Sequence, residues 1–130
     1  CRQASELLGD KFSWVEQGGR DQTLEFMAQS NVAVSCSSAE TFSLVSLEAM
    51  ALGQPILRNQ TGGWHEQLTE AKNGFDLGPP SAWVTPHQVA LIQRMRDPSL
   101  ISQSMLEQMS ESSVAKSKQL MSQSMISWLE

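Results

Sequence analysis

The sequence is poor in cationic residues. It has 9 Lys and Arg against 14 Asp and Glu in 130 residues, a formal net charge of -5, and the cations form no cluster. Nucleic-acid grooves and surfaces that bind anionic membranes both need clustered Lys and Arg, so the composition argues against these two functions. A phosphate-bearing ligand would have to be held by a few donors.

Cysteine and long apolar runs are also scarce. Cys1 and Cys36 are too few for a disulfide framework or a cysteine-based metal site, and Cys36 ends an apolar run where a buried free thiol is common. No run approaches the roughly 20 apolar residues that cross a bilayer, and no secretory signal opens the chain. We expect a cytoplasmic protein without a transmembrane segment, held at a membrane, if at all, by parts outside this chain.

The length fits one compact domain. The chain opens with Cys1 rather than Met, and residues 2–8 read like the end of a helix closed by Gly9. We therefore expect residues 1–130 to be a partial domain cut from a longer protein. The alternative is a short, frayed N-terminal helix in a complete protein.

Short apolar runs alternate with helical segments up to about residue 80. The runs are bounded by Gly, Asn or Ser and are expected to be strands at 11–16, 31–36, 55–57 and 75–77. Helices are expected after Asp21, which would cap the first of them, at 43–52 with Gly53 at its end, and at 64–70. This order predicts an α/β fold with a Rossmann-like, mainly parallel sheet.

Residues 84–130 are expected to form a helical tail. Thr85-Pro86-His87-Gln88 has the pattern of a capping box with Pro at the first helical position, and Asp97-Pro98 offers a second start. The Ser-, Gln- and Met-rich remainder predicts two helices of modest amphipathicity. Four methionines at near-helical spacing are expected to pack in the core or between helices: Met105, Met109, Met121 and Met125.

Glu48 is unusual within the expected helix 43–52. At about 100° per residue, Leu44, Val45, Leu47, Ala51 and Leu52 form one apolar arc, and Glu48 falls inside it. A carboxylate is rarely buried without a partner, because leaving it unpaired is costly. Glu48 is expected to meet a ligand hydroxyl, or to pair with Arg58 or another cation, or to escape to a rim.

The loop at 37–42 lies at the carboxyl end of an expected strand, where ligands bind in open α/β sheets. Backbone N–H groups at the start of the next helix, from Ser43 to Val45, and the positive end of its dipole favour a phosphate there. Glu48 would lie roughly 7 to 8 Å further along the helix axis, which suits the ribose next to a diphosphate.

Gly62 and Gly63 follow the next expected strand. Glycine lets a backbone approach a ligand closely, although an ordinary strand-to-helix turn would also explain the pair.

Together these residues resemble a known family. The ordered set comprises 40–53, 55–57, 61–63 with Glu66, Asn73-Gly74-Phe75 and Pro79-Pro80. It is similar to the C-terminal, donor-binding domain of retaining glycosyltransferases with the GT-B fold, a group that includes sucrose and glycogen synthases. The marker of that family is two glutamates separated by seven residues, here Glu40 and Glu48. The resemblance covers most of 12–98.

The resemblance implies transfer of a sugar from a nucleotide-diphosphate donor to an acceptor hydroxyl with retention of configuration. It implies no metal and no cofactor in most members, and an acceptor (a sugar, lipid or other hydroxyl compound) bound by an N-terminal domain outside this chain. Glu40 would be the catalytic residue beside the donor sugar, and Glu48 would bind the ribose. The donor sugar and diphosphate would contact Phe42, Ser43, Leu44, Gly62 and Gly63.

The sequence departs from the family pattern at several points. Thr41 and Ser43 stand where the family has glycine. The cations that neutralise the diphosphate, and two strands expected between 11–16 and 31–36 in the sheet, would lie upstream, so the isolated chain is expected to be inactive and marginally stable. The alternatives are a catalytically degenerate GT-B-like binding domain, or an epimerase or phosphorylase relative on the same fold.

Two of three further side chains are candidates for contact with the sugar. His65 could touch the sugar, although a lone loop histidine is more often solvated, and His87 at a helix start is given no role. Trp64, beside the glycines, is the aromatic residue best placed to stack on a sugar.

Overall fold

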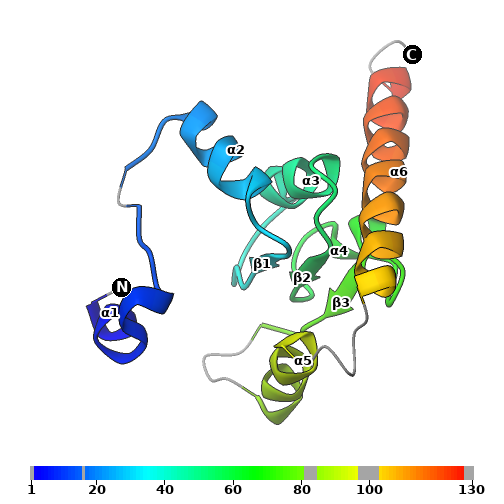
Figure 1. The fold of residues 1–130 in the computed structure, drawn as a ribbon. Helices are drawn as coiled ribbons and strands as arrows, with labels where there is room; N and C mark the ends of the chain where they lie inside the picture. The colour runs from blue at the N-terminus through cyan, green and yellow to red at the C-terminus, as the bar shows by residue number, and fades with distance from the viewer. Residues whose placement is uncertain (1, 16, 81–84, 97–102, 128–130) are drawn as a thin grey trace.

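The computed structural model describes residues 2–15, 17–80, 85–96 and 103–127 (Figure 1). Its elements alternate between helix and strand and then become helical. In chain order they are α1 (Arg2–Leu8), a 3-10 turn η1 (Gly9–Lys11), α2 (Arg20–Ala28), β1 (Ala33–Ser35), α3 (Leu44–Ala51), β2 (Ile56–Arg58), α4 (Trp64–Gln67), β3 (Gly74–Asp76), α5 (Pro86–Arg96) and α6 (Gln103–Ser127).

The sheet has three parallel strands in the order β1-β2-β3. Val34 lies opposite Leu57, and Leu57 lies opposite Phe75. Each strand is followed by a helix before the next parallel strand, which is the connection that parallel pairing requires. The predicted α/β class and the strands expected at 31–36, 55–57 and 75–77 are confirmed, in shorter form.

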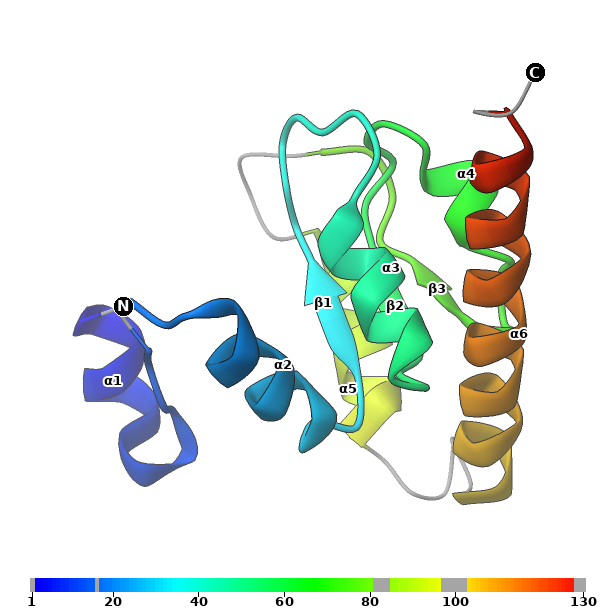
Figure 2. The same ribbon diagram turned by 90° about the horizontal axis from the view of Figure 1, so that it is seen from above.

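Helices cover both faces of this sheet. Figures 1 and 2 show α3 on one face and α5 on the other. Because successive side chains of a strand point to opposite faces, the two buried neighbours in β2 enter different clusters. Leu57 packs with Phe75, Leu91 and Met109, and Ile56 packs with the second cluster, Ala49, Met50, Leu68 and Leu120. Helix α6 contributes to both clusters and ties the faces together.

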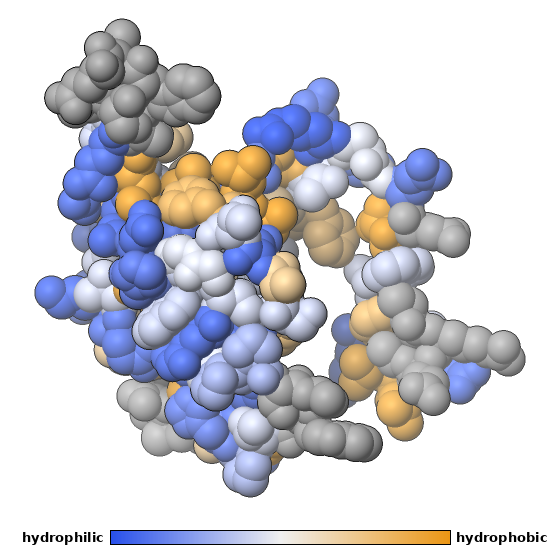
Figure 3. Space-filling view, turned by 180° about the vertical axis from the view of Figure 1, so that it is seen from behind, coloured by the Kyte–Doolittle hydropathy of each residue, from blue (hydrophilic) through white to orange (hydrophobic). Residues whose placement is uncertain are grey.

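The buried face of α3 is not the predicted one. Ser46, Ala49 and Met50 are buried, whereas Leu44 is 65 % exposed and Val45 58 % exposed. The expected arc of apolar residues was therefore wrong as a guide to the core. Ala49 and Met50 pack with Ile56 of β2 in the second core cluster. Figure 3 shows apolar side chains reaching the surface near the upper edge of the main body.

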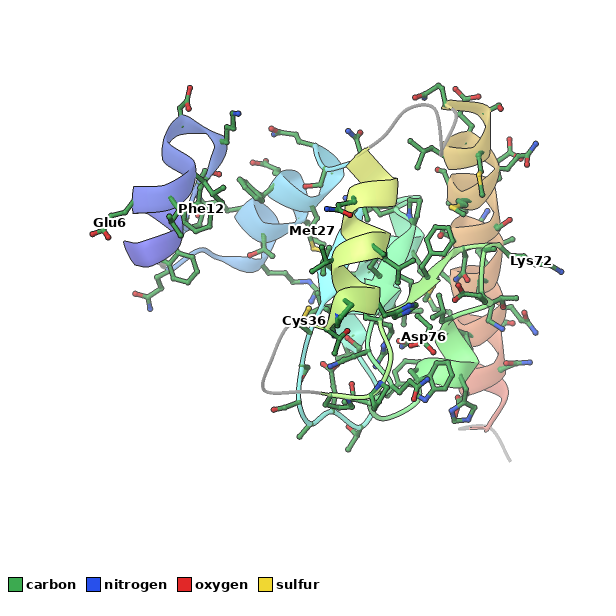
Figure 4. The ribbon with its side chains drawn as sticks, turned by 90° about the horizontal axis from the view of Figure 1, so that it is seen from below. Glu6, Phe12, Met27, Cys36, Lys72 and Asp76 are labelled. Atoms are coloured by element: carbon green, nitrogen blue, oxygen red, sulfur yellow. The ribbon has the colours of Figure 1, made fainter. Side chains whose placement is uncertain are left out.

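The strand expected at 11–16 does not form. Lys11 belongs to η1, residues 12–15 have no strand assignment, Trp14 and Val15 are exposed, and Glu16 lies outside the described residues. Figure 4 shows Phe12 beside α1 and apart from the sheet. A strand needs a neighbour for its backbone groups, and none pairs with this segment in the described part of the chain. β1 is an edge of the three-stranded sheet, with Val34 largely exposed.

Two smaller expectations in this half were also wrong. Asp21 does not cap α2, because the helix begins at Arg20 and its N-cap is Gly19, two residues before Asp21. Cys36 is exposed rather than buried. Met27 does pack against the second core cluster, and Figure 4 shows it reaching from α2 towards the main body.

The start of α5 follows the prediction. The Thr85 N–H donates to Gln88 Oε1 at 3.0 Å, and the Gln88 N–H donates to Thr85 Oγ1 at 3.2 Å. This is the reciprocal capping box, with Pro86 as the first helical residue.

After α5, α6 is a single helix of 25 residues, so the expectation of two helices was wrong. The segment 103–127 contains no Gly or Pro to break it, and serine hydroxyls bond backbone carbonyls within the helix, as Ser117 does to Val114 at 2.8 Å. Met109 is buried as expected, but Met121 is 41 % exposed. Asp97-Pro98 and the side chain of Met125 lie outside the described residues. In the described ranges no helix is both long and apolar enough to cross a membrane.

Candidate functional site

The N-terminus of α3 lies at the carboxyl edge of the sheet, after the loop that leaves β1. Ser43 is the N-cap, and its Oγ accepts a hydrogen bond from the Ser46 N–H at 3.2 Å. Ser43, which stands where the resembled family has glycine, therefore caps the helix. Gly53, with φ of 80°, follows the C-cap residue Leu52 as predicted.

The loop after β2 packs directly on the loop after β1. The Gly63 N–H donates to the Thr41 carbonyl at 2.7 Å. Gly62 has φ of 54°, and a Cβ on it would lie 2.3 Å from the carbonyl oxygens of both Glu40 and Thr41. The glycine at position 62 thus has a structural reason, the close approach of two backbones, independent of any ligand.

The buried side chain of Arg58 connects these two loops. It is the last residue of β2, and its side chain is 1 % exposed. Nη2 donates to the Thr61 carbonyl at 2.7 Å, and Nη1 donates to Gln67 Oε1. Gln67 Nε2 in turn donates to the Ser43 carbonyl at 3.0 Å. One buried guanidinium therefore links β2, the loop at 61–63 and the start of α3.

Glu40 completes this cluster. Its Oε2 lies 3.7 Å from Arg58 Nη2, and its side chain is 27 % exposed. Burial lowers the pKa of Arg58 and the Glu40 carboxylate raises it, but an arginine still keeps its charge in a protein. Glu40 Oε2 and Arg58 Nε are both buried without a hydrogen-bond partner, so the pair attracts through charge while the carboxylate keeps its capacity to accept hydrogen bonds.

Glu48 has a different cation. Its Oε1 lies 2.5 Å from Arg20 Nη2, with side-chain exposures of 25 % and 73 %. Of the partners considered from the sequence, the pair with Arg58 is not formed and a pair with another cation is. Because Arg20 is mostly in solvent, the bond is of the weak, screened kind.

The sequence did not indicate that Arg58 would pair with Glu40. The available signal was an arginine directly after the apolar run 55–57, in a strand expected to be buried. Such a cation needs a partner, but which of the two glutamates supplies it depends on the orientation of α3 and of the loop before it.

The aromatic and imidazole side chains lie to one side of this cluster. Trp64 lines a cavity of about 460 Å³ together with Gln60, Leu68, Glu70, Asp76, Gly78 and His87. His65 is exposed, 3.9 Å from Glu66, and its ring meets that of Trp64 edge to face at 6.1 Å. His87 Nε2 lies 3.1 Å from the Asp76 carbonyl. Among the described residues, no three His, Cys, Asp or Glu side chains gather as a metal site requires.

Solved structures share this architecture. Sucrose-phosphate synthase from Thermosynechococcus elongatus is 26 % identical, with a TM-score of 0.73 over 92 % of this chain and 28 % of that chain. The C-terminal domain of the glycosyl transferase group 1 family protein LpcC from Francisella tularensis is 17 % identical, with a TM-score of 0.63 over 91 % of this chain and 58 % of that chain. The fold is that of the C-terminal half of a GT-B glycosyltransferase.

A curated relative and a family model agree with this fold. N-acetyl-alpha-D-glucosaminyl L-malate synthase from Bacillus anthracis is 36 % identical over 58 residues, which are 45 % of this chain and 15 % of the relative. The match thus covers a small part of this curated relative. The model described as glycosyl transferases group 1 matches residues 1–97. Glu40 lies in the loop before α3 and Glu48 lies in α3 of this fold. The chain belongs to the glycosyl transferases group 1 family.

Proposed function

We propose that this chain is the donor-binding part of a retaining glycosyltransferase, which moves a sugar from a nucleotide-diphosphate donor to an acceptor hydroxyl. The observation that carries the proposal is the position of Glu40. Its partly exposed carboxylate stands at the carboxyl edge of the parallel sheet, directly before the N-terminus of α3, with a buried cation behind it. This edge is where open α/β sheets bind their ligands.

In this proposal Glu40 contacts the hydroxyls of the transferred sugar. The backbone at Phe42, Ser43 and Leu44, with Gly62 and Gly63, lines the sugar and the diphosphate. The N-terminus of α3 offers backbone N–H groups and a partial positive charge to the phosphates. Glu48, on the same helix, binds the ribose once it leaves Arg20. The acceptor attacks on the face of the departing diphosphate, whose oxygens take the acceptor proton.

Replacing the two glutamates by glutamine is expected to change different kinetic quantities. Contacts with the transferred sugar strengthen as positive charge develops on it, so Glu40→Gln should mainly lower turnover. A contact with the unreacting ribose is nearly equal in the ground and transition states, so Glu48→Gln should mainly weaken nucleotide binding. Each loss should be about ten- to a hundredfold, for a charge-assisted hydrogen bond worth ~1.5–3 kcal/mol.

The test uses the full-length protein. UDP, GDP and ADP are titrated calorimetrically, and sugar release and transfer are followed with the matching nucleotide sugars. Glu111→Gln, on exposed α6 surface, is the control and should match the parent protein. If both glutamate variants keep turnover and nucleotide affinity within about twofold, the assignment is wrong. Nucleotide binding without transfer in the parent protein would instead identify a degenerate binding domain.

A further inference from the structure

Arg58 occupies a position where a charge has to be compensated. Both core clusters use residues of β2 next to it, and its own side chain is almost completely removed from solvent. Burying a cation is costly, and the cost is offset only where the geometry brings acceptors to it. The guanidinium finds three: the Thr61 carbonyl, Gln67 Oε1 and, by charge, the Glu40 carboxylate.

The planar fork of arginine suits this arrangement. Nη1 and Nη2 point to acceptors on different segments at once, which the single ammonium of lysine cannot reproduce in the same geometry. Gln67, which accepts from the Arg58 guanidinium, also donates to the carbonyl of Ser43, and Ser43 is the residue that caps α3. The Arg58 guanidinium therefore fixes the positions of the loops after β1 and β2 relative to one another.

The Glu40 contact differs from the other two. At 3.7 Å it is an ion pair without a hydrogen bond, and Glu40 Oε2 has no hydrogen-bond partner. The buried Oε2 is attracted to Arg58, while the Glu40 side chain as a whole stays 27 % exposed. The part of the side chain that remains exposed can therefore meet sugar hydroxyls while the ion pair holds the carboxylate in place.

We propose that Arg58 is a positioning residue for transfer, which orients the Glu40 carboxylate and does not touch the donor. The proposal rests on the role of Glu40 given above. Arg58, a buried strand residue, should therefore affect turnover and not nucleotide affinity. The reason is that Glu48, at the expected ribose position, pairs with Arg20, and none of the bonds described for Arg58 reaches either residue.

The experiment compares Arg58→Met, which keeps the length and loses the charge, with Arg58→Lys, which keeps the charge and loses the fork. Both are made in the full-length protein, alone and combined with Glu40→Gln. Lys118→Met, an exposed cation on α6, is the control. Turnover is measured with the nucleotide sugar that the parent protein uses, and affinity is measured with the matching nucleoside diphosphate.

We expect each Arg58 variant to lower kcat about tenfold or more while nucleotide affinity stays within about twofold. If Arg58 acts through Glu40, the same Arg58 change should cost less than about threefold in the Glu40→Gln background. Should Arg58→Met fail to fold, Arg58→Lys and its combination with Glu40→Gln carry the same two expectations.

Two results would overturn the positioning role: unchanged turnover in Arg58→Lys, or losses that multiply fully with Glu40→Gln, as for a residue that acts only on stability. The Glu40→Gln arm separates this outcome from a failure of the proposed function. If Glu40→Gln alone leaves turnover intact, the proposed role of Glu40 fails and the Arg58 inference falls with it.

Discussion

Gly62→Ala should destabilise the protein by more than its backbone conformation alone explains. Gly62 has φ of 54°, and the added Cβ would lie 2.3 Å from two backbone carbonyl oxygens, those of Glu40 and Thr41. Because these are backbone atoms rather than flexible side-chain ends, the loops have to separate. That separation would stretch the hydrogen bond from the Gly63 N–H to the Thr41 carbonyl, now 2.7 Å.

The magnitude follows from these two costs. An alanine in the left-handed region costs about 1–2 kcal/mol, and losing the net contribution of one hydrogen bond costs about 0.5–1.5 kcal/mol. The expected loss in the free energy of unfolding is therefore ~1.5–3.5 kcal/mol. Gly78 provides the control, since it has φ of 85° but nothing within 4 Å of its added Cβ. Gly78→Ala should cost only the conformational part, about 1–2 kcal/mol.

Urea denaturation of both variants and the parent, with the transition followed by tryptophan fluorescence and by circular dichroism, measures the difference. Equal midpoints for Gly62→Ala and Gly78→Ala would refute the reasoning, because they would mean that the loops after β1 and β2 are not in contact at Gly62. Nucleotide titration of Gly62→Ala then asks whether separating the loops also weakens donor binding.

Two further predictions concern α2 and α6. Arg20→Gln should tighten nucleotide binding by up to about fivefold in calorimetric titrations, because an exposed ion pair worth ~0.2–1 kcal/mol no longer competes for Glu48; weaker binding would mean that Glu48 has no part in the site. Met109→Ala should lower the free energy of unfolding by about 2–5 kcal/mol, because this side chain is buried in the first core cluster. Met121 is 41 % exposed on the same helix, so Met121→Ala should cost less, about 1 kcal/mol, and similar losses for the two would contradict the described rotation of α6.

Local signals in the sequence were enough for most of the elements. The runs that contain Val34, Leu57 and Phe75 are short, apolar and flanked by turn residues, so their strands could be predicted without knowledge of their neighbours. The capping box at Thr85 and the Ser43 cap are equally local, because their hydrogen bonds join residues three apart in the chain. The paired glutamates, with their spacing and context, also indicated the family.

The tertiary structure decided which residues contact one another where the local sequence allows more than one contact. The sequence of α3 permits either its Leu44 and Val45 side or its Ala49 and Met50 side to face the core, and in the structure the second side is buried. The run that contains Trp14 has strand character, but it stays unpaired in the described chain because no neighbour meets it.

The tertiary structure also decided which cation pairs with each glutamate of the site. Glu40 and Glu48 each needed a positive partner, and the sequence offered several. Only the approach of the loops after β1 and β2, which Gly62 permits, places Arg58 beneath Glu40 and leaves Glu48 to Arg20. Charge pairing depends on distances through space, and these are set by how helices dock on the sheet rather than by spacing along the chain.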